Sequence, residues 1–352
     1  MPNAVLTERD IFEYASYLGF GEINMEVDHA TGMHAIIAVH SNKLGPAIGG
    51  TRFVHYESSN EAIIDALRLA AMMSYKAAIC GLKHGGGKAV IIKSGEIKSR
   101  EALFERFGKF VHRNEGRYIA AMDSGTTMTD MDAIAKSTDY VTCTTKDPGN
   151  GNPSPHTALG VCRGIEAAVK FKMGQDSLHD VHIALQGVGN VGYFLAKLLH
   201  EKGAKLTVCD INNEAVQRCV EEFGATAVDL GAIYDVPCDV FSPCALGSSI
   251  NPKTIDRLKC KIVAGAANNQ LAHRTLDEIL HHHNILFAPD FLINAGGLIH
   301  VAEIYDHGDE ERARRQIINL YDETLRIFER AQAEDKPTNQ IARTIAEERL
   351  ND

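Results

Sequence analysis

The segment from Val181 to Asp210 constrains the fold of this 352-residue chain more than any other part of it. The apolar run Val181–Gln186 leads directly into the glycine motif Gly187–Gly192, and Tyr193–Glu201 then has the composition of a helix. A second strand-like run, Lys205–Cys209, follows and is closed by the acid Asp210. This alternation of strand, turn, helix and strand is typical of an α/β fold with a parallel sheet.

Each glycine of the motif has a separate physical task. Gly187 permits a tight turn, Gly189 lets a pyrophosphate approach the helix N-terminus, and Gly192 allows close packing of helix and strand. Asp210 can accept hydrogen bonds from adenosine ribose hydroxyls, and Ile-Asn-Asn follows it in place of an arginine for a 2′-phosphate. The segment therefore predicts a dinucleotide site that favours NAD over NADP. A structural domain of the same topology without a nucleotide is the alternative.

A second unusual segment holds two lysines, Lys76 and Lys88, with three consecutive glycines before the second. The apolar spacing before Lys76 predicts an amphipathic helix that ends near it, and the residues after Lys88 predict a buried strand. We expect Gly85–Gly87 to form a loop that lets a ligand approach. Neighbouring cations lower each other's pKa, so a lysine held here can act as a general base.

Two other interpretations of this glycine–lysine segment exist. One is a solvated helix end followed by a flexible turn. The other is a phosphate-binding P-loop, which the sequence excludes because Leu82 stands where its first glycine is required. Ala89 also replaces the Ser or Thr that would bind magnesium.

Composition limits the class of protein and its partners. The hydrophobic fraction of 45% and the charged fraction of 23% are ordinary for a globular protein, and the length allows two domains. The net charge of −10 argues against a nucleic acid or an anionic membrane as partner, and no apolar run is long enough to span a bilayer. We expect a cytoplasmic protein, because the N-terminus lacks a signal-peptide pattern and the eight scattered cysteines form no Cys-x-x-Cys pair.

The remaining pattern alternates strands and helices. The run His281–His283 is expected at a helix C-terminus rather than at a metal, because consecutive helical residues point about 100° apart. Residues 146–156 hold three prolines and two glycines, which is typical of a linker or hinge. Strands are expected at 35–39, 89–92 and 118–121, a loop at 41–51, and helices at 60–80, 102–112, 157–170, 309–332 and after Pro337.

Several further stretches occur in one order over nearly the whole chain. With them the sequence resembles the glutamate/leucine/phenylalanine/valine dehydrogenase superfamily, and within it most closely the leucine dehydrogenase branch. The stretches are Leu44–Arg52, Met73–Lys88, Ala121–Thr127, Gly187–Gly192, Ser242–Gly247, Ala264–Leu271 and Ala288–Gly297.

The resemblance implies reversible, NAD-dependent oxidative deamination of an L-amino acid to a 2-oxo acid and ammonia. It implies that Lys76, helped by backbone N–H groups near Gly49 and Gly50, holds the substrate carboxylate. Lys88 is then the general base that activates water, and Asp123 moves protons with it. An NAD-binding regulatory or scaffold protein is the non-enzymatic alternative, although such a protein would not need a base.

The resemblance also implies the lining of the site. The substrate side is completed by residues Leu44, Ala121, Asn268, Leu298 and Val301. The cofactor side comprises Gly187, Gly189, Asn190, Val191, Gly192, Asp210, Thr157, Cys244, Ala245, Asn268 and Asn294. No metal is expected at either side.

Ala121 and Leu298 bear on the choice of substrate within the family. Ala121 fits a leucine-preferring pattern, whereas Leu298 is typical of the phenylalanine-preferring one, so leucine comes first and valine, isoleucine and phenylalanine stay open. One methylene in an apolar pocket changes discrimination by only about 1–3 kcal/mol. Glutamate would require an added basic pocket residue.

The resemblance implies two α/β domains with an active-site cleft between them. We expect residues 1–145, joined by a C-terminal helix at about 335–352, to bind substrate and form a homo-oligomer, either a dimer or an octamer. Residues 146–334 would form a Rossmann domain for NAD. Segment 146–156 would then act as the hinge for a closure that excludes water.

Overall fold

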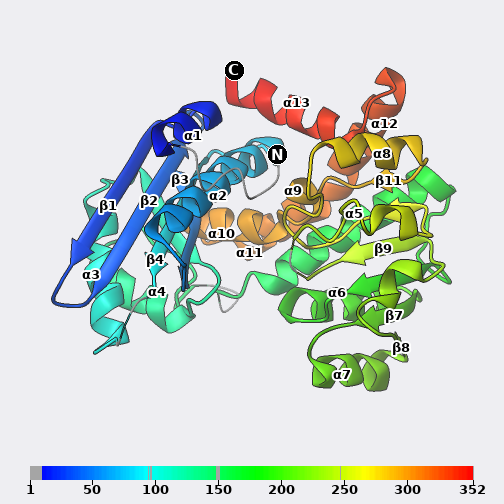
Figure 1. Ribbon diagram of the computed structural model, residues 1–352, viewed down its shortest axis with the longest axis horizontal. Helices are drawn as coiled ribbons and strands as arrows, with labels where there is room; N and C mark the ends of the chain where they lie inside the picture. Colours follow the sequence, from blue (N-terminus) through cyan, green and yellow to red (C-terminus); the bar gives the residue numbers. More distant parts are fainter. Residues whose placement is uncertain (1–9, 94, 96, 148–150, 246, 352) are drawn as a thin grey trace. The chain divides into compact units, whose positions relative to one another are not determined.

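The computed structural model describes residues 10–93, 95, 97–147, 151–245 and 247–351 (Figure 1). The described chain forms two compact units. The first unit contains the residues up to Asn152, together with Val301–Glu310 and the residues from Ala346 onward. The second unit contains Pro153–His300 and Glu311–Ile345. The sequence-based boundaries lie at 145/146 and 334/335, whereas this division falls at 152/153 and 345/346 and also assigns Val301–Glu310 to the first unit.

The first unit is built on a mixed five-stranded sheet in the order β1-β2-β4-β3-β5. The neighbouring pairs β1·β2 and β2·β4 are antiparallel, whereas β3 runs parallel to both β4 and β5. Its strands are β1 (Glu22–Asp28), β2 (Met33–Ser41), β3 (Ala47–Val54), β4 (Gly85–Ile92) and β5 (Tyr118–Met122). Its first helices are α1 (Ile11–Leu18), α2 (Ser59–Ile79), α3 (Arg100–His112) and α4 (Met128–Ala135).

Helix α2 forms where the apolar spacing predicts it. Ser58 caps its N-terminus by accepting the Glu61 N–H, and Lys76 lies in its last turn. The small residues Ala62, Ala66 and Ala70 are fully buried in a cluster with residues of β2 and β4. Small side chains let the helix approach the sheet closely, which sets the position of both lysine-bearing elements.

Two expected loops are strands in the structure. Gly85–Gly87 begins β4 instead of preceding it, and the expected loop 41–51 ends at Ala47, where β3 starts. The reason is close packing of backbones. A Cβ at Gly86 would lie 2.0 Å from the Ser74 nitrogen in α2, and one at Gly49 would lie 1.8 Å from the Gly87 oxygen. These glycines therefore allow contact between elements rather than flexibility between them.

The second unit holds a six-stranded parallel sheet in the order β11-β10-β9-β6-β7-β8. This is the doubly wound arrangement, with its switch point between β6 and β9. Its strands are β6 (His182–Gln186), β7 (Lys205–Cys209), β8 (Thr226–Ala227), β9 (Val240–Pro243), β10 (Ile262–Val263) and β11 (Leu286–Phe287). The remaining helices are α5 (Ser154–Met173), α6 (Asn190–Glu201), α7 (Asn213–Phe223), α8 (Thr275–His282), α9 (Asp290–Ile293), α10 (Gly296–His307), α11 (Glu310–Ile318), α12 (Leu320–Glu334) and α13 (Thr338–Asn351). The α/β fold class is confirmed.

Three other predicted segments can be compared with the structure. The long helix predicted at 309–332 is divided into α11 and α12 by a single turn residue, Asn319. Of the expected hinge 146–156, residues 148–150 lie outside the described part of the chain, and Ser154 already begins α5. His281 and His282 lie in the last turn of α8, as predicted.

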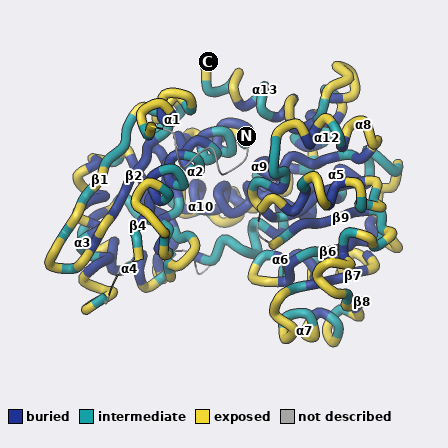
Figure 2. Tube along the Cα trace, viewed as in Figure 1, coloured by how far each residue is buried: buried dark blue, intermediate teal, exposed yellow. Residues whose placement is uncertain are grey.

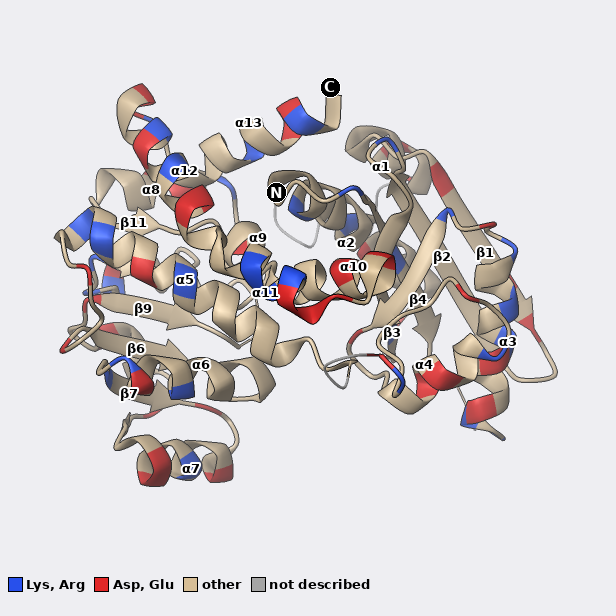
Figure 3. Cartoon of the chain, turned by 180° about the vertical axis from the view of Figure 1, so that it is seen from behind, with Lys and Arg blue, Asp and Glu red and all other residues tan. Residues whose placement is uncertain are grey.

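The core of the second unit lies between the sheet and its helices. Figure 2 shows the strands β6 and β9 as buried, and α5, α6 and α12 contribute apolar side chains against them. Figure 3 shows that both signs of charge are interspersed along α7 and α12. All eight cysteines are free thiols. Within the described residues, no helix combines the length and apolar character needed to cross a membrane.

Asp277 in α8 ties the start of α13 to the second unit. It is 5% exposed, and its Oδ2 accepts the backbone N–H of Gln340 at 3.2 Å. Burial raises the pKa of Asp277 to about 7, although hydrogen bonds from the Gln340 and Asn339 backbones oppose this shift. An ionised carboxylate at this position therefore costs folding free energy at neutral pH.

We expect Asp277→Asn to stabilise the protein at alkaline pH. A carboxyl group whose pKa is raised on folding contributes stability that is fully present below about pH 4 and is lost as the pH rises to about 7. The neutral amide does not ionise, so the melting temperature of the variant minus that of the wild type should be larger at about pH 8 than at about pH 5. Thermal melts of both proteins at these two pH values measure this difference, and the same difference at both pH values would contradict the prediction.

Candidate active site

Lys88 lies at the centre of the sheet of the first unit. It is the fourth residue of β4, and it is only 5% exposed. Its Nζ lies 2.8 Å from Oδ2 of Asp123, which directly follows β5. Strand β3 separates these two strands, so the ion pair spans it.

Gly50 on β3 provides the space for this pair. A Cβ at Gly50 would lie 2.6 Å from the Asp123 Cβ and 3.0 Å from the Lys88 Nζ. The backbone of Gly50 also pairs with Ala121 on β5, which places that predicted substrate-side residue beside the pair. Any larger residue at position 50 must push the two charged groups apart.

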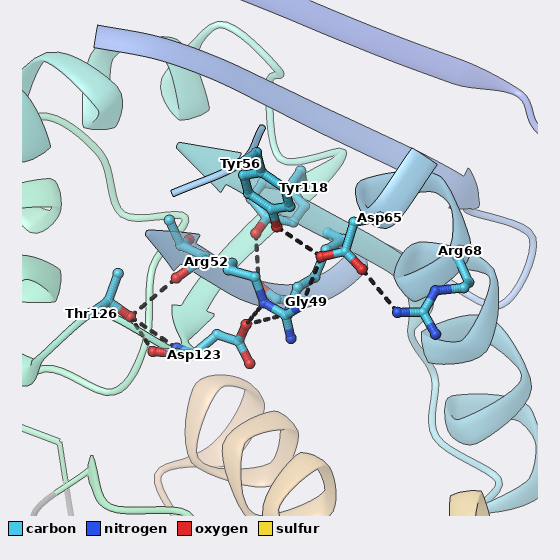
Figure 4. Close-up of polar contacts among 10 residues, drawn as sticks. Gly49, Arg52, Tyr56, Asp65, Arg68, Tyr118, Asp123 and Thr126 are labelled. Carbon is cyan, nitrogen blue, oxygen red and sulfur yellow. Dashed lines mark hydrogen bonds and ion pairs between the residues drawn. The ribbon is translucent and has the colours of Figure 1, made fainter. Parts of the chain in front are cut away.

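Arg52 is the residue that sequence reasoning missed. Its Nε lies 2.9 Å from the same Oδ2 of Asp123, and its Nη1 lies 2.7 Å from Oδ2 of Asp65 on α2 (Figure 4). Asp65 also accepts hydrogen bonds from Tyr56 and Arg68. The available signal was the alternation of β3, because a residue two positions after Gly50 points to the same face of the sheet.

The charges of this cluster shift one another's pKa. Burial lowers the pKa of Lys88, Asp123 raises it, and Arg52 lowers it. For Asp123, burial raises the pKa, but Lys88 and Arg52 outweigh it and bring the pKa down to about 2. Asp123 is therefore ionised at any working pH, while Lys88 is moved toward the neutral form that a base requires.

The loop after β5 fixes the position of Asp123. The Asp123 backbone N–H donates to Thr126 Oγ1 at 2.9 Å, and that hydroxyl lies 3.1 Å from the Thr51 carbonyl (Figure 4). At the start of β5, Tyr118 Oη donates to the Gly49 carbonyl at 2.7 Å. Strand β5 and the loop that carries Asp123 are thus both fixed to the backbone of β3.

The other predicted substrate-side residues lie on separate elements. Lys76 is in the last turn of α2, and Leu44 lies before β3 in the turn that leads to it. Leu298 and Val301 are one turn apart in α10 and are 9% and 6% exposed. His84 joins the first unit's part of α10 to the segment before β4, since its Nε2 lies 2.9 Å from Asp306 Oδ2.

The glycine motif of the second unit has the predicted geometry. Gly187 adopts a φ of +96°, and a Cβ there would lie 2.7 Å from the Ala245 nitrogen. A Cβ at Gly192 would lie 2.0 Å from the Gly187 oxygen, whereas one at Gly189 would meet no described atom within 4 Å. Helix α6 begins with Asn190 and Val191, and the loop before it is tightly packed at Gly187. Gly189 is the exception, and it leaves space where a dinucleotide would approach.

Asp210 is held by the glycine loop. Its Oδ2 accepts the Val188 N–H at 2.7 Å and its Oδ1 accepts the Asn212 N–H at 2.9 Å. The adjacent strand end is fixed as well, because the Cys244 N–H donates to the Gln186 carbonyl at 2.7 Å. The carboxylate is thus oriented at the carboxyl end of β7, where adenosine would lie in a doubly wound sheet.

The structure also brings together the predicted residues of the nicotinamide side. Asn294 Nδ2 donates to Asn268 Oδ1 at 2.9 Å. Thr157 Oγ1 donates to the Pro153 carbonyl at 3.0 Å, and a Cβ at Gly297 would lie 2.6 Å from that hydroxyl. Two amides and a hydroxyl are groups that can bind a carboxamide.

Comparison with known proteins identifies the family of the chain. The model of the Glu/Leu/Phe/Val dehydrogenase dimerisation domain matches residues 20–140, and that of the glutamate/leucine/phenylalanine/valine dehydrogenase matches 151–218 and 208–305. The chain belongs to the Glu/Leu/Phe/Val dehydrogenase family.

Individual relatives extend over almost the whole chain. A leucine dehydrogenase of Geobacillus stearothermophilus is 50% identical over 97% of this chain and 93% of its own length. A valine dehydrogenase of Streptomyces albus is 41% identical over 94% of this chain and 92% of its own. The crystal structure of L-tryptophan dehydrogenase from Nostoc punctiforme has a TM-score of 0.83 at 40% identity, covering 97% of this chain and 98% of that one.

We expect Gly50→Ala to lower kcat by at least about tenfold, because it displaces Lys88 and Asp123, and a shift of a fraction of an ångström in groups that take part in a reaction is costly. Nucleotide binding should stay near the wild-type value, since Gly50 lies in the other unit. The matched control is Gly231→Ala, where a Cβ would meet nothing within 4 Å. Steady-state kinetics and nucleotide titration measure both, and an unchanged kcat in Gly50→Ala would contradict the assignment.

Proposed function

We propose that this protein catalyses the reversible NAD-dependent oxidative deamination of branched-chain L-amino acids, with leucine first and valine and isoleucine next. The products are the 2-oxo acid and ammonia. The buried pair of Lys88 and Asp123 is the observation that carries the proposal, because a protein that only binds NAD has no need of such a base. The 50% identity to a leucine dehydrogenase supports the choice of leucine.

Three residues of the first unit, Lys76, Lys88 and Asp123, have distinct roles in this reaction. Lys76 binds the substrate carboxylate, helped by the backbone at Gly49 and Gly50. Lys88 in its neutral form takes a proton from the water that attacks the substrate imine. Asp123 stays ionised, and as an anion it stabilises the ammonium product and the protonated form of Lys88.

The residues of the second unit fit NAD. The free space at Gly189 and the N-terminus of α6 suit the pyrophosphate, and the oriented carboxylate of Asp210 suits the ribose hydroxyls. That carboxylate repels a 2′-phosphate, which favours NAD over NADP. NAD supplies the hydride acceptor when bound. Thr157 would contact its carboxamide, and Asn268 and Asn294 would line the nicotinamide and substrate side.

A second candidate substrate class is the aromatic amino acids. Leu298 fits the phenylalanine-preferring pattern, and the L-tryptophan dehydrogenase structure is similar over nearly the whole chain. Ala121, beside the catalytic pair, narrows the pocket relative to a glycine and favours the branched-chain class. A comparison of kcat/KM for leucine and phenylalanine decides between them.

The chain forms a homo-oligomer through its first unit. Among the described strands, β1 pairs only with β2, so it is an edge of the sheet. Met25 and Val27 on this edge are 65% and 55% exposed, and Phe12 and Tyr17 on α1 are 81% and 68% exposed. Exposed apolar side chains along the unpaired edge of a strand are typical of an association surface.

The eight free thiols suit the reducing cytoplasm, where we place the enzyme.

Lys88→Ala should abolish turnover with every L-amino acid while NAD binding survives. Removal of a general base costs about 10²–10⁴-fold in rate. The measurement is NADH absorbance at alkaline pH with a panel of L-amino acids, repeated with NADP. No turnover by the wild type would refute the enzyme, turnover with glutamate alone would refute the leucine preference, and a near-normal kcat of the variant would show that Lys88 is not the base.

The double substitution Met25→Asp and Val27→Asp should lower the molecular mass measured by light scattering after size-exclusion chromatography. Charges on the strand edge oppose pairing with a second copy. Leu230→Asp, at a 47% exposed position of the second unit, is the control and should leave the mass unchanged. A wild-type mass retained by the double variant would place the interface elsewhere.

A further inference from the structure

Arg52 and Lys88 compete for one atom. Both lie within 2.9 Å of Oδ2 of Asp123, through the Nε of Arg52 and the Nζ of Lys88. The Arg52 side chain is 23% exposed and that of Lys88 is 6% exposed, so neither contact is a solvated surface pair. A carboxylate that faced Lys88 alone in such a place would hold the lysine proton firmly.

The charges around Arg52 alternate along a chain of contacts. Asp123, Arg52, Asp65 and Arg68 follow one another at 2.9, 2.7 and 2.9 Å (Figure 4). Their formal charges are −1, +1, −1 and +1, which cancel. The cluster is therefore balanced when Lys88 is neutral, and it carries one excess positive charge when Lys88 is protonated.

We propose that Arg52 is a positioning residue that neutralises Asp123 and so allows Lys88 to release its proton at the pH of the reaction. This inference rests on the proposed function of Lys88 as the base. Arginine suits this task because its guanidinium stays charged at all working pH values and contacts two carboxylates at once. A lysine in its place would itself exchange protons with Asp123.

The charged groups that act on Lys88 come from three elements. Asp123 at the end of β5 and Asp65 on α2 raise its pKa, whereas burial and Arg52 on β3 lower it. Substitutions at Arg52 and Asp65, which contact each other directly, should therefore shift the pKa of Lys88 in opposite directions. Loss of the Arg52 charge should raise the pKa of Lys88, and loss of the Asp65 charge should lower it.

The decisive experiment compares Arg52→Gln with the wild type by the pH dependence of kcat/KM for leucine. We expect the acid limb to move to higher pH by about one unit or more, as for a unit charge a few ångströms away at an intermediate dielectric. Asp65→Asn should move the same limb to lower pH. A limb within about 0.3 units of the wild type in Arg52→Gln would overturn the proposal.

Arg106→Gln is the matched control. Arg106 contacts two carboxylates, Glu26 and Asp28, and its side chain is 25% exposed, close to the value for Arg52. Its loss should leave the acid limb in place, and an equal shift in this control would show that any arginine in the unit has the same effect. If Arg52→Gln does not fold, Asp65→Asn decides alone, and a limb that stays or rises would refute the proposal.

A titration that needs no turnover separates this inference from the proposed function. The Cε signal of Lys88 is followed by ¹³C NMR against pH and assigned by its absence in Lys88→Arg. A higher midpoint in Arg52→Gln supports the role of Arg52 even if no amino acid is turned over, in which case only the proposed function fails. An unchanged midpoint refutes the role of Arg52 even if the enzyme is active.

Discussion

The burial of the Lys88 ammonium group is the constraint on which the first unit depends. An ammonium removed from water is costly unless an anion lies in contact with it, and Asp123 provides that anion. The contact requires space on β3, the strand between β4 and β5, and Gly50 supplies that space. Strand order and glycine placement therefore both serve one ion pair.

Sequence patterns were sufficient where local physics decides the structure. The βαβ segment around Gly187, helix α2 and the turn at Asp210 follow from apolar period and glycine chemistry, and the structure agrees with them. Gly85–Gly87 was misjudged as a loop, because three glycines have no strand propensity of their own. Their strand is imposed by neighbours on both sides, which is tertiary information that a single sequence window lacks.

The partial identification of the active site has a similar cause. Lys88 and Asp123 belong to recognisable motifs, whereas the motif that contains Arg52 indicates no role for it. Its importance arises from sharing one carboxylate oxygen with Lys88, and its second partner, Asp65, comes from a different element. Contacts of this kind depend on strand order, which places β3 between β4 and β5 and was not deducible from spacing along the chain.

Two aspartates at carboxyl ends of strands show how one residue type is given two functions. Asp210 after β7 accepts backbone N–H groups, which orient it without neutralising its charge, so it suits neutral hydroxyls and repels phosphate. Asp123 after β5 accepts two cationic side chains, which hold its pKa at about 2 and fix it as a permanent anion. The partners, rather than the aspartate, decide the chemistry. An aspartate paired with Lys88 alone would favour the protonated lysine, whereas the charge of Arg52 lowers the pKa of Lys88, which is the direction that a general base requires.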